Sequence, residues 1–136
     1  MGNESMNDVV GTWRLVRARA FAEDGSELDT PYGGETGKGV VVLGADGRMI
    51  SVLCDGRADL PAGAAREYNS YCGAYRFDGK QLVTRVDAAS DSARMGTDQV
   101  RDVRFEGELM VLRPPADTYK GVKRQRELYW RRVAEE

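Results

Sequence analysis

Gly11-Thr12-Trp13 begins the first run of alternating residues in this chain, and Trp130-Arg131-Arg132 lies in the last such run. An antiparallel barrel closes only when its final strand pairs with its first, because an open edge leaves backbone donors and acceptors unpaired. An indole at the floor of such a barrel is well covered by an arginine from the closing strand, since the guanidinium gains cation–π attraction and stays near solvent. The two motifs therefore predict a closed container in which Trp13 and Arg132 stack at one end.

Acidic-glycine dipeptides divide the chain into short runs of alternating residues. Such dipeptides supply the positive φ that tight hairpins need. They occur at Asp24-Gly25, Asp46-Gly47, Asp78-Gly79 and Glu106-Gly107. The runs predict strands near residues 10–20, 38–44, 48–54, 70–77, 81–89, 98–106, 108–113 and 126–133. About eight short strands joined mostly by hairpins indicate an all-β fold, a single antiparallel up-and-down β-barrel.

Residues 59–67 interrupt the strand pattern. Asp59 is a candidate N-cap, Pro61 follows early, and alanines come after it. This order predicts a helix of one or two turns, placed as a lid over one mouth of the barrel. The basic run 120–126, in contrast, is expected to be a solvated hairpin tip.

The length and composition indicate one globular domain. The chain has 136 residues, no linker divides it, and 41% of it is hydrophobic, which suffices for one core. Residues 1–8 lack the basic region and the apolar core of a secretory signal, so we expect a disordered lead-in followed by one domain over 9–136 and a cytoplasmic protein.

The charge pattern argues against two classes of partner. The 20 basic and 22 acidic residues are interspersed and give a net charge of −2, so no basic patch of the size that nucleic acid needs is expected. No apolar run approaches the roughly 20 residues that cross a bilayer, so no membrane partner is expected either.

Cys54 and Cys72 are the only cysteines, and the chain has no histidine. In a cytoplasmic protein we expect two reduced thiols that serve as small hydrophobes, with a disulfide across adjacent strands as the less favoured alternative. Two cysteines without a second spaced pair do not make a zinc cluster. The sequence therefore predicts no metal and no cofactor.

Period-two alternation indicates which side chains face the interior. In residues 98–106, Asp102 and Arg104 should face water. The opposite face of that run holds Gln99, Arg101, Val103 and Phe105. In the last run Leu128, Trp130 and Arg132 share a face, and in residues 70–77 the shared face holds Tyr71, Gly73, Tyr75 and Phe77.

Residues 81–89 leave two alternatives open. Val83, Arg85 and Asp87 share one face of this run, and Leu82, Thr84, Val86 and Ala88 share the other. Both faces mix polar and apolar groups, so alternation alone does not decide which of them points inward.

The ordered set of motifs resembles the small bacterial lipocalin-like domain family from about residue 10 to residue 133. The residues that carry the resemblance are Gly11-x-Trp13-x-Leu15, Gly39, Asp46-Gly47-Arg48-Met49, Arg57, Tyr71-x-Gly73-x-Tyr75, Gly96, Arg101 and Trp130-x-Arg132. The resemblance implies a β-barrel with a central cavity for a small, largely apolar molecule. It implies no particular reaction, because barrels host both carriers and enzymes.

The resemblance also orients residues 81–89. Similar domains tend to carry a histidine about where Arg85 stands and a serine about where Ser90 stands. If that position faces the lumen, Val83, Arg85 and Asp87 face it too. An arginine cannot shuttle protons near neutral pH as a histidine can, so a proton-transfer role at this position is not inherited.

The expected site combines charged and aromatic side chains from neighbouring strands. Arg85 and Arg101 would bind a carboxylate or an enolate oxygen. Asp87 would serve as general base and the Tyr71 phenol as proton donor. The other expected ligand-binding residues are Tyr75, Phe105 and Trp130. The structural alternative is an ion pair inside the barrel between Asp87 and one of the two arginines.

Two functions are compatible with these residues. The favoured one is a carrier or sensor that binds a small apolar or aromatic metabolite in the barrel cavity. The other is a cofactor-independent cyclase or isomerase acting on a polyketide- or terpenoid-like substrate, as in secondary metabolism, with Asp87 as its base. Val40 and Val42 are expected on the outer face, where an apolar surface is compatible with a homodimer.

Overall fold

The computed structural model describes residues 8–28, 36–119 and 121–134, and the predicted lead-in at residues 1–7 lies outside them. The strands, in chain order, are β1 (Gly11–Ala22), β2 (Lys38–Leu43), β3 (Arg48–Cys54), β4 (Tyr68–Phe77), β5 (Gln81–Ala89), β6 (Asp98–Glu106), β7 (Leu109–Arg113), β8 (Asp117–Tyr119) and β9 (Val122–Ala134). Each of the eight predicted strands is confirmed. The short strand β8 was not predicted, and β9 begins four residues earlier than expected.

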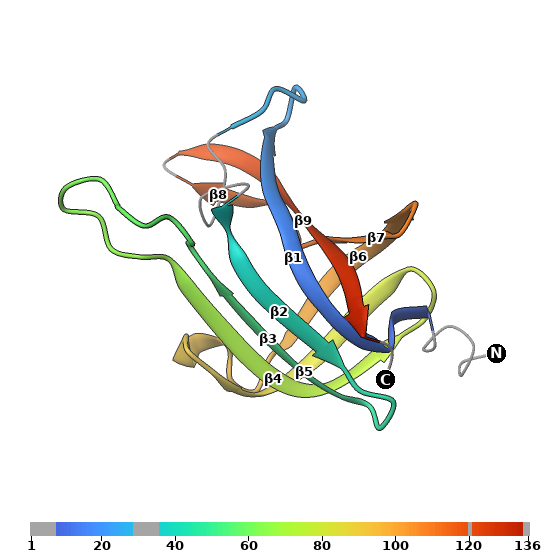
Figure 1. Ribbon diagram of the computed structural model, residues 1–136. Coiled ribbons are helices and arrows are strands. Elements are labelled where there is room, and N and C mark those ends of the chain that lie inside the picture. The colour runs from blue at the N-terminus through green and yellow to red at the C-terminus, as the bar shows by residue number, and fades with distance from the viewer. Residues whose placement is uncertain (1–7, 29–35, 120, 135–136) are drawn as a thin grey trace.

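The strands form one closed antiparallel barrel. Each strand from β1 to β7 pairs with the next, β7 pairs with β9, and β9 returns to pair with β1. The short β8 pairs only with β9, beyond the end of β7. Figure 1 shows β1 and β9 side by side across the front of the barrel. The predicted all-β up-and-down barrel is therefore confirmed.

Four hairpins turn at the acidic-glycine dipeptides, as predicted. The glycine of each has a positive φ, for example 85° at Gly47 and 100° at Gly79. The carboxylate of the preceding aspartate closes the turn by accepting a backbone hydrogen bond two residues ahead, at 3.0 Å from Arg48 and 2.9 Å from Lys80.

The helix predicted over residues 59–67 is wrong. This segment forms turns and irregular backbone, and it projects from the ends of β3 and β4 rather than forming a helical lid (Figure 1). The N–H of Ala64 donates to the carbonyl of Pro61 at 3.0 Å, and Gly63 between them has a φ of 78°. A glycine in that conformation makes a tight turn and stops helix propagation. The one helical element described after β1 is η2 (Ser92–Arg94), a single 3-10 turn.

The floor of the barrel has the predicted stack. Trp13 is 2% exposed and lies opposite Arg132 in the β1–β9 register. The Arg132 guanidinium carbon lies 4.4 Å from the Trp13 ring centroid. The indole Nε1 donates to the Val9 carbonyl at 2.8 Å, and Arg132 Nη2 donates to the Asp8 carbonyl at 2.7 Å. Asp8 and Val9 are thereby held across the floor.

Most of the barrel interior is filled by side chains. The core contains residues from β1 to β5, β7 and β9, and the partly buried Val103 of β6 packs against it. Its members include Leu15, Leu43, Met49, Phe77, Leu82, Met110 and Trp130. Met49 and Met110 are 4% and 0% exposed and fill gaps between these larger groups. The barrel is therefore largely solid, and space for a ligand is confined to its ends.

The predicted orientation of β5 is wrong. Leu82, Thr84 and Val86 are 1–2% exposed and form the inner face of this strand. Arg85 and Asp87 lie on the outer face, where Arg85 pairs with Asp98 at 3.4 Å. This face points inward because Leu82 and Val86 complete the core there. Burying the charges of Arg85 and Asp87 instead would cost about several kcal/mol for each ion.

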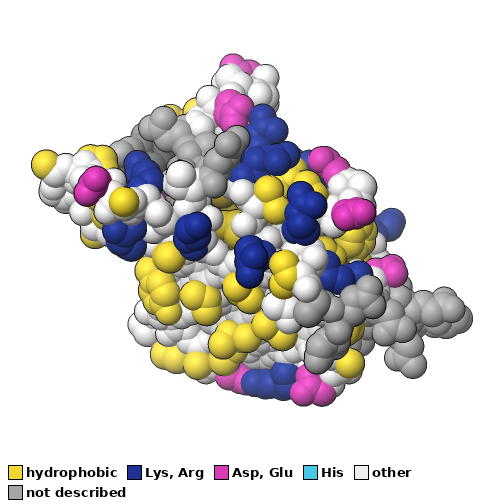
Figure 2. All heavy atoms as spheres, viewed as in Figure 1, with side chains coloured by type: hydrophobic (Ala, Val, Ile, Leu, Met, Phe, Trp, Pro, Cys, Tyr) yellow, Lys and Arg dark blue, Asp and Glu magenta, His cyan; other side chains and the backbone are white. Residues whose placement is uncertain are grey.

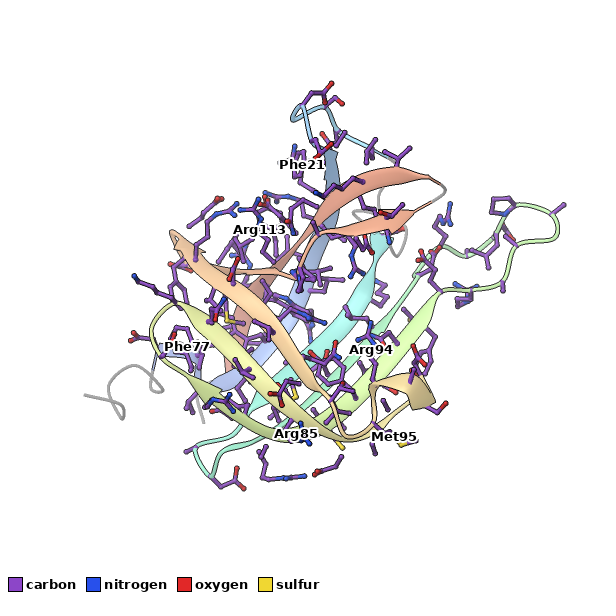
Figure 3. All side chains as sticks on the ribbon, turned by 180° about the vertical axis from the view of Figure 1, so that it is seen from behind. Phe21, Phe77, Arg85, Arg94, Met95 and Arg113 are labelled. Atoms are coloured by element: carbon purple, nitrogen blue, oxygen red, sulfur yellow. The ribbon has the colours of Figure 1, made fainter. Side chains whose placement is uncertain are left out.

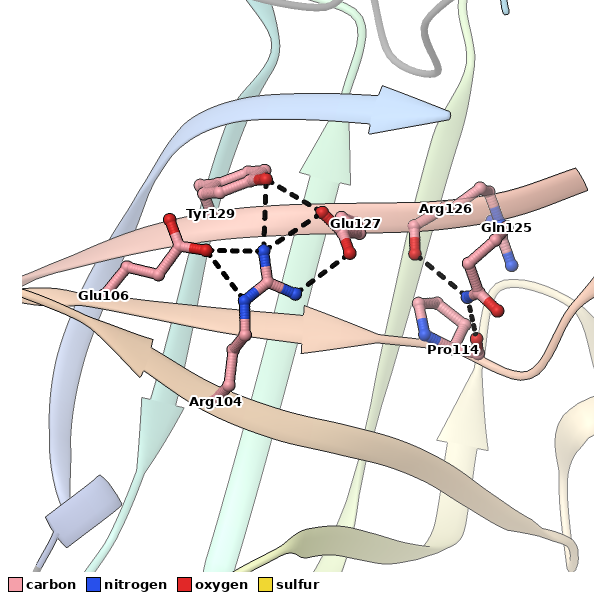
Figure 4. A network of polar contacts seen from close by, with 7 residues as sticks. All are labelled: Arg104, Glu106, Pro114, Gln125, Arg126, Glu127 and Tyr129. Atoms are coloured by element: carbon pink, nitrogen blue, oxygen red, sulfur yellow. Dashed lines mark hydrogen bonds and ion pairs between the residues drawn. The ribbon is translucent and has the colours of Figure 1, made fainter. Parts of the chain in front are cut away.

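A polar network ties the outer face of β9 to β6 (Figure 4). Arg104 donates two hydrogen bonds to the Glu127 carboxylate, at 2.9 and 3.2 Å, and the Tyr129 hydroxyl donates to the same carboxylate at 2.8 Å. A second guanidinium, that of Arg17, covers the Tyr129 ring at 4.3 Å. Glu127 and Tyr129 are thereby buried although they face away from the core. Arg104 faces outward, as predicted, and there it forms hydrogen bonds with Glu127 as well as contacting water.

An apolar surface covers the outer face of β2 and β3. Val40, Val42, Ile50 and Val52 face outward as two cross-strand pairs, Val40 with Val52 and Val42 with Ile50. Ile50 is 49% exposed. Figure 2 shows hydrophobic side chains gathered over this part of the barrel. The outward orientation of Val40 and Val42 is confirmed, and the homodimer stays a prediction.

The two cysteines are too far apart to bond. Cys72 lies opposite Ile50 and Cys54 lies opposite Tyr68, so the thiols are offset by four residues along neighbouring strands. That offset is about 13 Å at the rise of a β-strand, beyond the reach of a disulfide. Both thiols are free and half-buried.

No helix among the described residues is long and apolar enough to cross a membrane.

Replacing Trp13 by alanine should lower the free energy of unfolding by about 3–5 kcal/mol, because the substitution removes aromatic packing and leaves a cavity at the floor. Urea denaturation followed by far-UV circular dichroism measures this. Arg14→Ala, on the exposed outer face of the same strand, is the control and should stay within about 0.5 kcal/mol of the parent protein. Equal effects of the two substitutions would contradict the floor stack.

The Glu127 network should make folding sensitive to acid. Burial would raise the pKa of Glu127, but hydrogen bonds from Arg104 and Tyr129 outweigh it, and the pKa lies below its ordinary value of 4.5. A carboxyl whose pKa is lower in the folded state stabilises the fold above its ordinary pKa and loses that contribution as the pH falls through the folded value. Between pH 6 and pH 3, wild-type protein should lose more unfolding free energy than Glu127→Gln. Parallel losses in the two proteins would refute the role given to this carboxylate.

Candidate functional site

The interior has a hollow at the end of the barrel opposite the Trp13 floor. We call it the mouth hollow, and its lining residues come from β3, β4, η2, β6, β7 and β9 and from the segment after β7. These residues are Ser51, Leu53, Asn69, Tyr71, Arg94, Arg101, Leu112, Pro114, Arg126, Leu128 and Trp130. Its volume is about 20 Å³, which is room for about one water molecule.

Three arginines contribute to the mouth hollow, and no aspartate or glutamate is among its lining residues in the part of the chain that the structure describes. Arg101 on β6 is buried, with 8% of it exposed. Arg94 points from η2 toward the barrel interior, whereas Arg85 lies on the outside of β5 (Figure 3). Arg126 on β9 faces Asp117 of β8, with its Nε 3.8 Å from a carboxylate oxygen. The hollow is therefore rich in hydrogen-bond donors and positively charged.

Local backbone contacts position each of these side chains. Asp91 caps η2, its carboxylate accepting from the N–H of Ala93 at 3.0 Å. Arg101 is placed by the alternation of β6, opposite Leu82. Gln125 donates to the Pro114 carbonyl at 2.6 Å and so holds the segment after β7 against the start of β9 (Figure 4).

Two side chains that line the mouth hollow each carry a nitrogen without a hydrogen-bond partner within the described part of the chain. The nitrogens are Trp130 Nε1 and Arg94 Nη1, and both atoms are buried. The Arg94 guanidinium carbon lies 5.8 Å from the Tyr71 ring centroid, on the wall of the same hollow. Buried donors without acceptors are uncommon, because each forfeits its hydrogen bond to water.

The structure brings together three of the seven predicted site residues. Tyr71, Arg101 and Trp130 all line the mouth hollow. Tyr75 is also buried, but its hydroxyl donates to the Gly44 carbonyl at 2.7 Å, next to the floor end of β2. Burial, with a smaller effect from Asp46, raises the pKa of this phenol.

The other three predicted site residues lie outside the barrel interior. Asp87 is 53% exposed and forms an ion pair with Arg48, so the predicted pairing of Asp87 with an arginine inside the barrel is wrong. Arg85 is more exposed still. Phe105 is 45% exposed and lies at the floor end. The cyclase or isomerase hypothesis thereby loses the base that it named.

A bulge interrupts the pairing of β5 with β4 at Asp87. Gly73 pairs with Val86 and Cys72 pairs with Ala88, so Asp87 is the extra residue on β5. The backbones approach closely at this point, and a Cβ on Gly73 would overlap the Arg85 carbonyl oxygen. Glycine is therefore required at position 73, and the bulge breaks the alternation beyond Val86.

The sequence reasoning missed Arg94 and Arg126. Arg126 shares a period-two face with Leu128 and Trp130, so extending that face by one step would have placed it inside instead of at a hairpin tip. Arg94 follows β5 in a turn without alternation, and no sequence signal points to it.

A wide depression lies at the opposite end, outside the floor. It has a volume of about 520 Å³ and opens to the surface. Its lining residues are Asp8, Trp13, Phe105, Gly107, Glu108, Arg131, Arg132 and Val133. Two acidic and two basic side chains balance there, and the Trp13–Arg132 stack separates it from the interior. The mouth hollow lies inside the barrel, and the charged side chains described in its lining are all positive, so it is the stronger candidate for a ligand site.

The family model of the lipocalin-like domain matches residues 10–133. The chain belongs to the lipocalin-like domain family. The barrel and its closed floor agree with that membership, and a lipocalin-like barrel is consistent with binding of a small molecule. Neither the comparison with curated proteins nor the comparison with solved structures gave a match. Among the described residues, no three Cys, Asp or Glu side chains are grouped so that they could hold a metal ion.

The orientation of β5 can be tested by paired substitutions. Leu82→Ala should cost about 2–5 kcal/mol of unfolding free energy, because it empties a core position. Asp87→Ala should cost at most about 1 kcal/mol, because it removes one half of an exposed ion pair. Denaturant titration of both variants provides the measurement, and a cost for Asp87→Ala that matches Leu82→Ala would place the charge inside the barrel.

Proposed function

We propose that this lipocalin-like protein binds a small apolar or aromatic molecule inside the barrel, as a carrier or sensor, and that the ligand enters at the mouth hollow. The observation that carries the proposal is the difference between the two barrel ends. One end is sealed by the Trp13–Arg132 stack, and the other holds an interior hollow with apolar walls from Leu53, Leu112 and Leu128. Ligand sites in barrels are typically formed at such mouths.

Binding requires the mouth hollow to widen, because its 20 Å³ is far below the volume of an organic ligand. The strand residues in the wall are held by pairing on both sides, so they are costly to move. Arg94 lies on η2, a three-residue turn with no buried residue. Segments with few buried contacts open at low free energy. Movement of η2 and the Arg94 side chain is thus the least costly way to admit a ligand.

The chemistry of the wall supports binding over catalysis. Guanidinium groups stay protonated at all ordinary pH values and cannot serve as general bases. Among the described lining residues, the hydroxyls of Tyr71 and Ser51 are the remaining groups that could exchange a proton, and none of these residues is a carboxylate that could activate them. A carrier needs only a fitted wall and a few polar anchors, which the hollow supplies.

The proposal is tested with N-phenyl-1-naphthylamine, a neutral apolar dye whose fluorescence rises in apolar sites. Asn69→Trp, at the wall of the mouth hollow, should weaken dye binding by about tenfold or more, because the indole fills the entrance. Ser70→Trp places the same indole on the outer face of β4 and serves as the matched control. It should bind the dye like the parent protein.

Two results would overturn the proposal. One is dye binding that Asn69→Trp leaves unchanged, which would move the site to the floor depression or to the apolar face of β2 and β3. The other is no dye binding by the parent protein at concentrations up to the dye's solubility. Circular dichroism of each variant confirms that the barrel is folded.

A further inference from the structure

Arg101 is a buried cation at the mouth hollow. It is 8% exposed, and its side chain donates to two neutral groups, the Val100 carbonyl at 2.9 Å and the Gln99 side-chain oxygen at 3.3 Å. Within the described residues no carboxylate pairs with it. Burying a charge is costly unless an opposite charge compensates it. The positive charge of this guanidinium could therefore be neutralised by an anion that binds from outside the chain.

Other guanidiniums of the protein show how these charges are usually met. Arg57 holds Asp55 through three side-chain hydrogen bonds, and Arg104 holds Glu127 through two. Arg101 departs from this pattern although it is more buried than either. The guanidinium of Arg101 at the mouth hollow thus differs from those of Arg57 and Arg104, which are paired with carboxylates.

Two further donors face the same hollow without acceptors. Trp130 is 1% exposed, and its indole Nε1 has no hydrogen-bond partner, whereas the Trp13 indole donates to the Val9 carbonyl. Arg94 Nη1 is likewise buried without a partner. The hollow therefore offers an indole N–H and two guanidiniums, Arg94 and Arg101, and over residues 36–119 and 121–134 its lining includes no acidic side chain to accept from them.

We infer that the ligand of the mouth hollow is an organic carboxylate, whose anionic group binds Arg101, Arg94 and the Trp130 indole N–H. This inference rests on the proposed function and adds the chemical class of the ligand. A planar carboxylate matches the paired donors of a guanidinium. Its two oxygens can accept the hydrogen bonds that Arg94 and Trp130 lack.

The apolar wall distinguishes a carboxylate from a phosphate. Leu53, Leu112 and Leu128 line the hollow beside the arginines, so the charged group enters together with an apolar body. A monoanion loses less hydration than a phosphate dianion when it enters such a site, and the two uncompensated guanidiniums balance it more than fully. An aromatic or branched aliphatic acid fits both the cations and the walls.

The test compares three ligands with one ring system: 2-naphthoate, 2-naphthamide and 2-naphthyl phosphate. The dissociation constants are measured at pH 7 by quenching of protein fluorescence and by calorimetry. Naphthoate should bind wild-type protein about 30-fold more tightly than the uncharged amide, in keeping with the cost of leaving a buried charge unpaired. Naphthyl phosphate should bind more weakly than naphthoate.

Substitutions assign the preference to named residues. Arg101→Met should reduce the ratio between naphthoate and naphthamide to about threefold or less, while the amide still binds. Arg94→Met is a second variant outside the core strands and should reduce the same ratio even if Arg101→Met folds poorly. Arg85→Met, on the outer face of β5, is the matched control and should keep the wild-type ratio.

The outcomes separate this inference from the proposed function. If amide and carboxylate bind equally well and Asn69→Trp blocks both, the proposed function stands and the carboxylate inference is overturned. If the phosphate binds most tightly, the ligand class is wrong. If the preference for the carboxylate survives in Arg101→Met and Arg94→Met, the anion binds elsewhere and the inference fails.

Discussion

The pairing of β9 with β1 is the constraint on which the rest of this structure depends. It runs from Thr12 opposite Ala134 to Ala22 opposite Arg124, almost the full length of both strands. Without it the sheet would have two long open edges, and its inner face would be exposed to water. With it, the chain has an inside, a sealed floor at Trp13 and Arg132, and a mouth at the other end.

Closure also explains why both faces of β9 are buried. Leu128 and Trp130 face the core, and Glu127 and Tyr129 face outward beneath Arg17 and Arg104. The outer residues are polar, so they need partners, and Arg17 of the adjacent β1 and Arg104 of β6, one strand beyond β7, supply them. The closing strand is thereby fixed by apolar packing on one side and by charged hydrogen bonds on the other.

Arginines serve two different purposes in this barrel. On the outer surface they pair with carboxylates and cover aromatic rings, and these contacts hold neighbouring strands together. At the mouth hollow, Arg101 and Arg94 have no such carboxylate partners among the described residues. An arginine of this protein has a structural role where a carboxylate of the chain faces it. At the mouth hollow no described carboxylate faces Arg101 or Arg94, and the proposed ligand would take that place.

Sequence alone determined the parts of this protein that depend on local chemistry. The acidic-glycine turns, the eight predicted strands and the pairing of Trp13 with Arg132 follow from backbone sterics and side-chain period, and each was correct, whereas alternation misplaced Phe105. Alternation also placed Arg101, Tyr71 and Trp130 inside. Sequence alone did not determine which face of β5 points inward, because both of its faces mix polar and apolar groups. Only the packing of Leu82 and Val86 against the other strands decides between the two faces. The bulge at Asp87, the turn at Gly63 and the position of Arg94 likewise depend on backbone contacts between residues far apart in the chain. The tertiary structure therefore decided which charges lie inside the barrel, because burial is a property of the closed sheet and of no single strand.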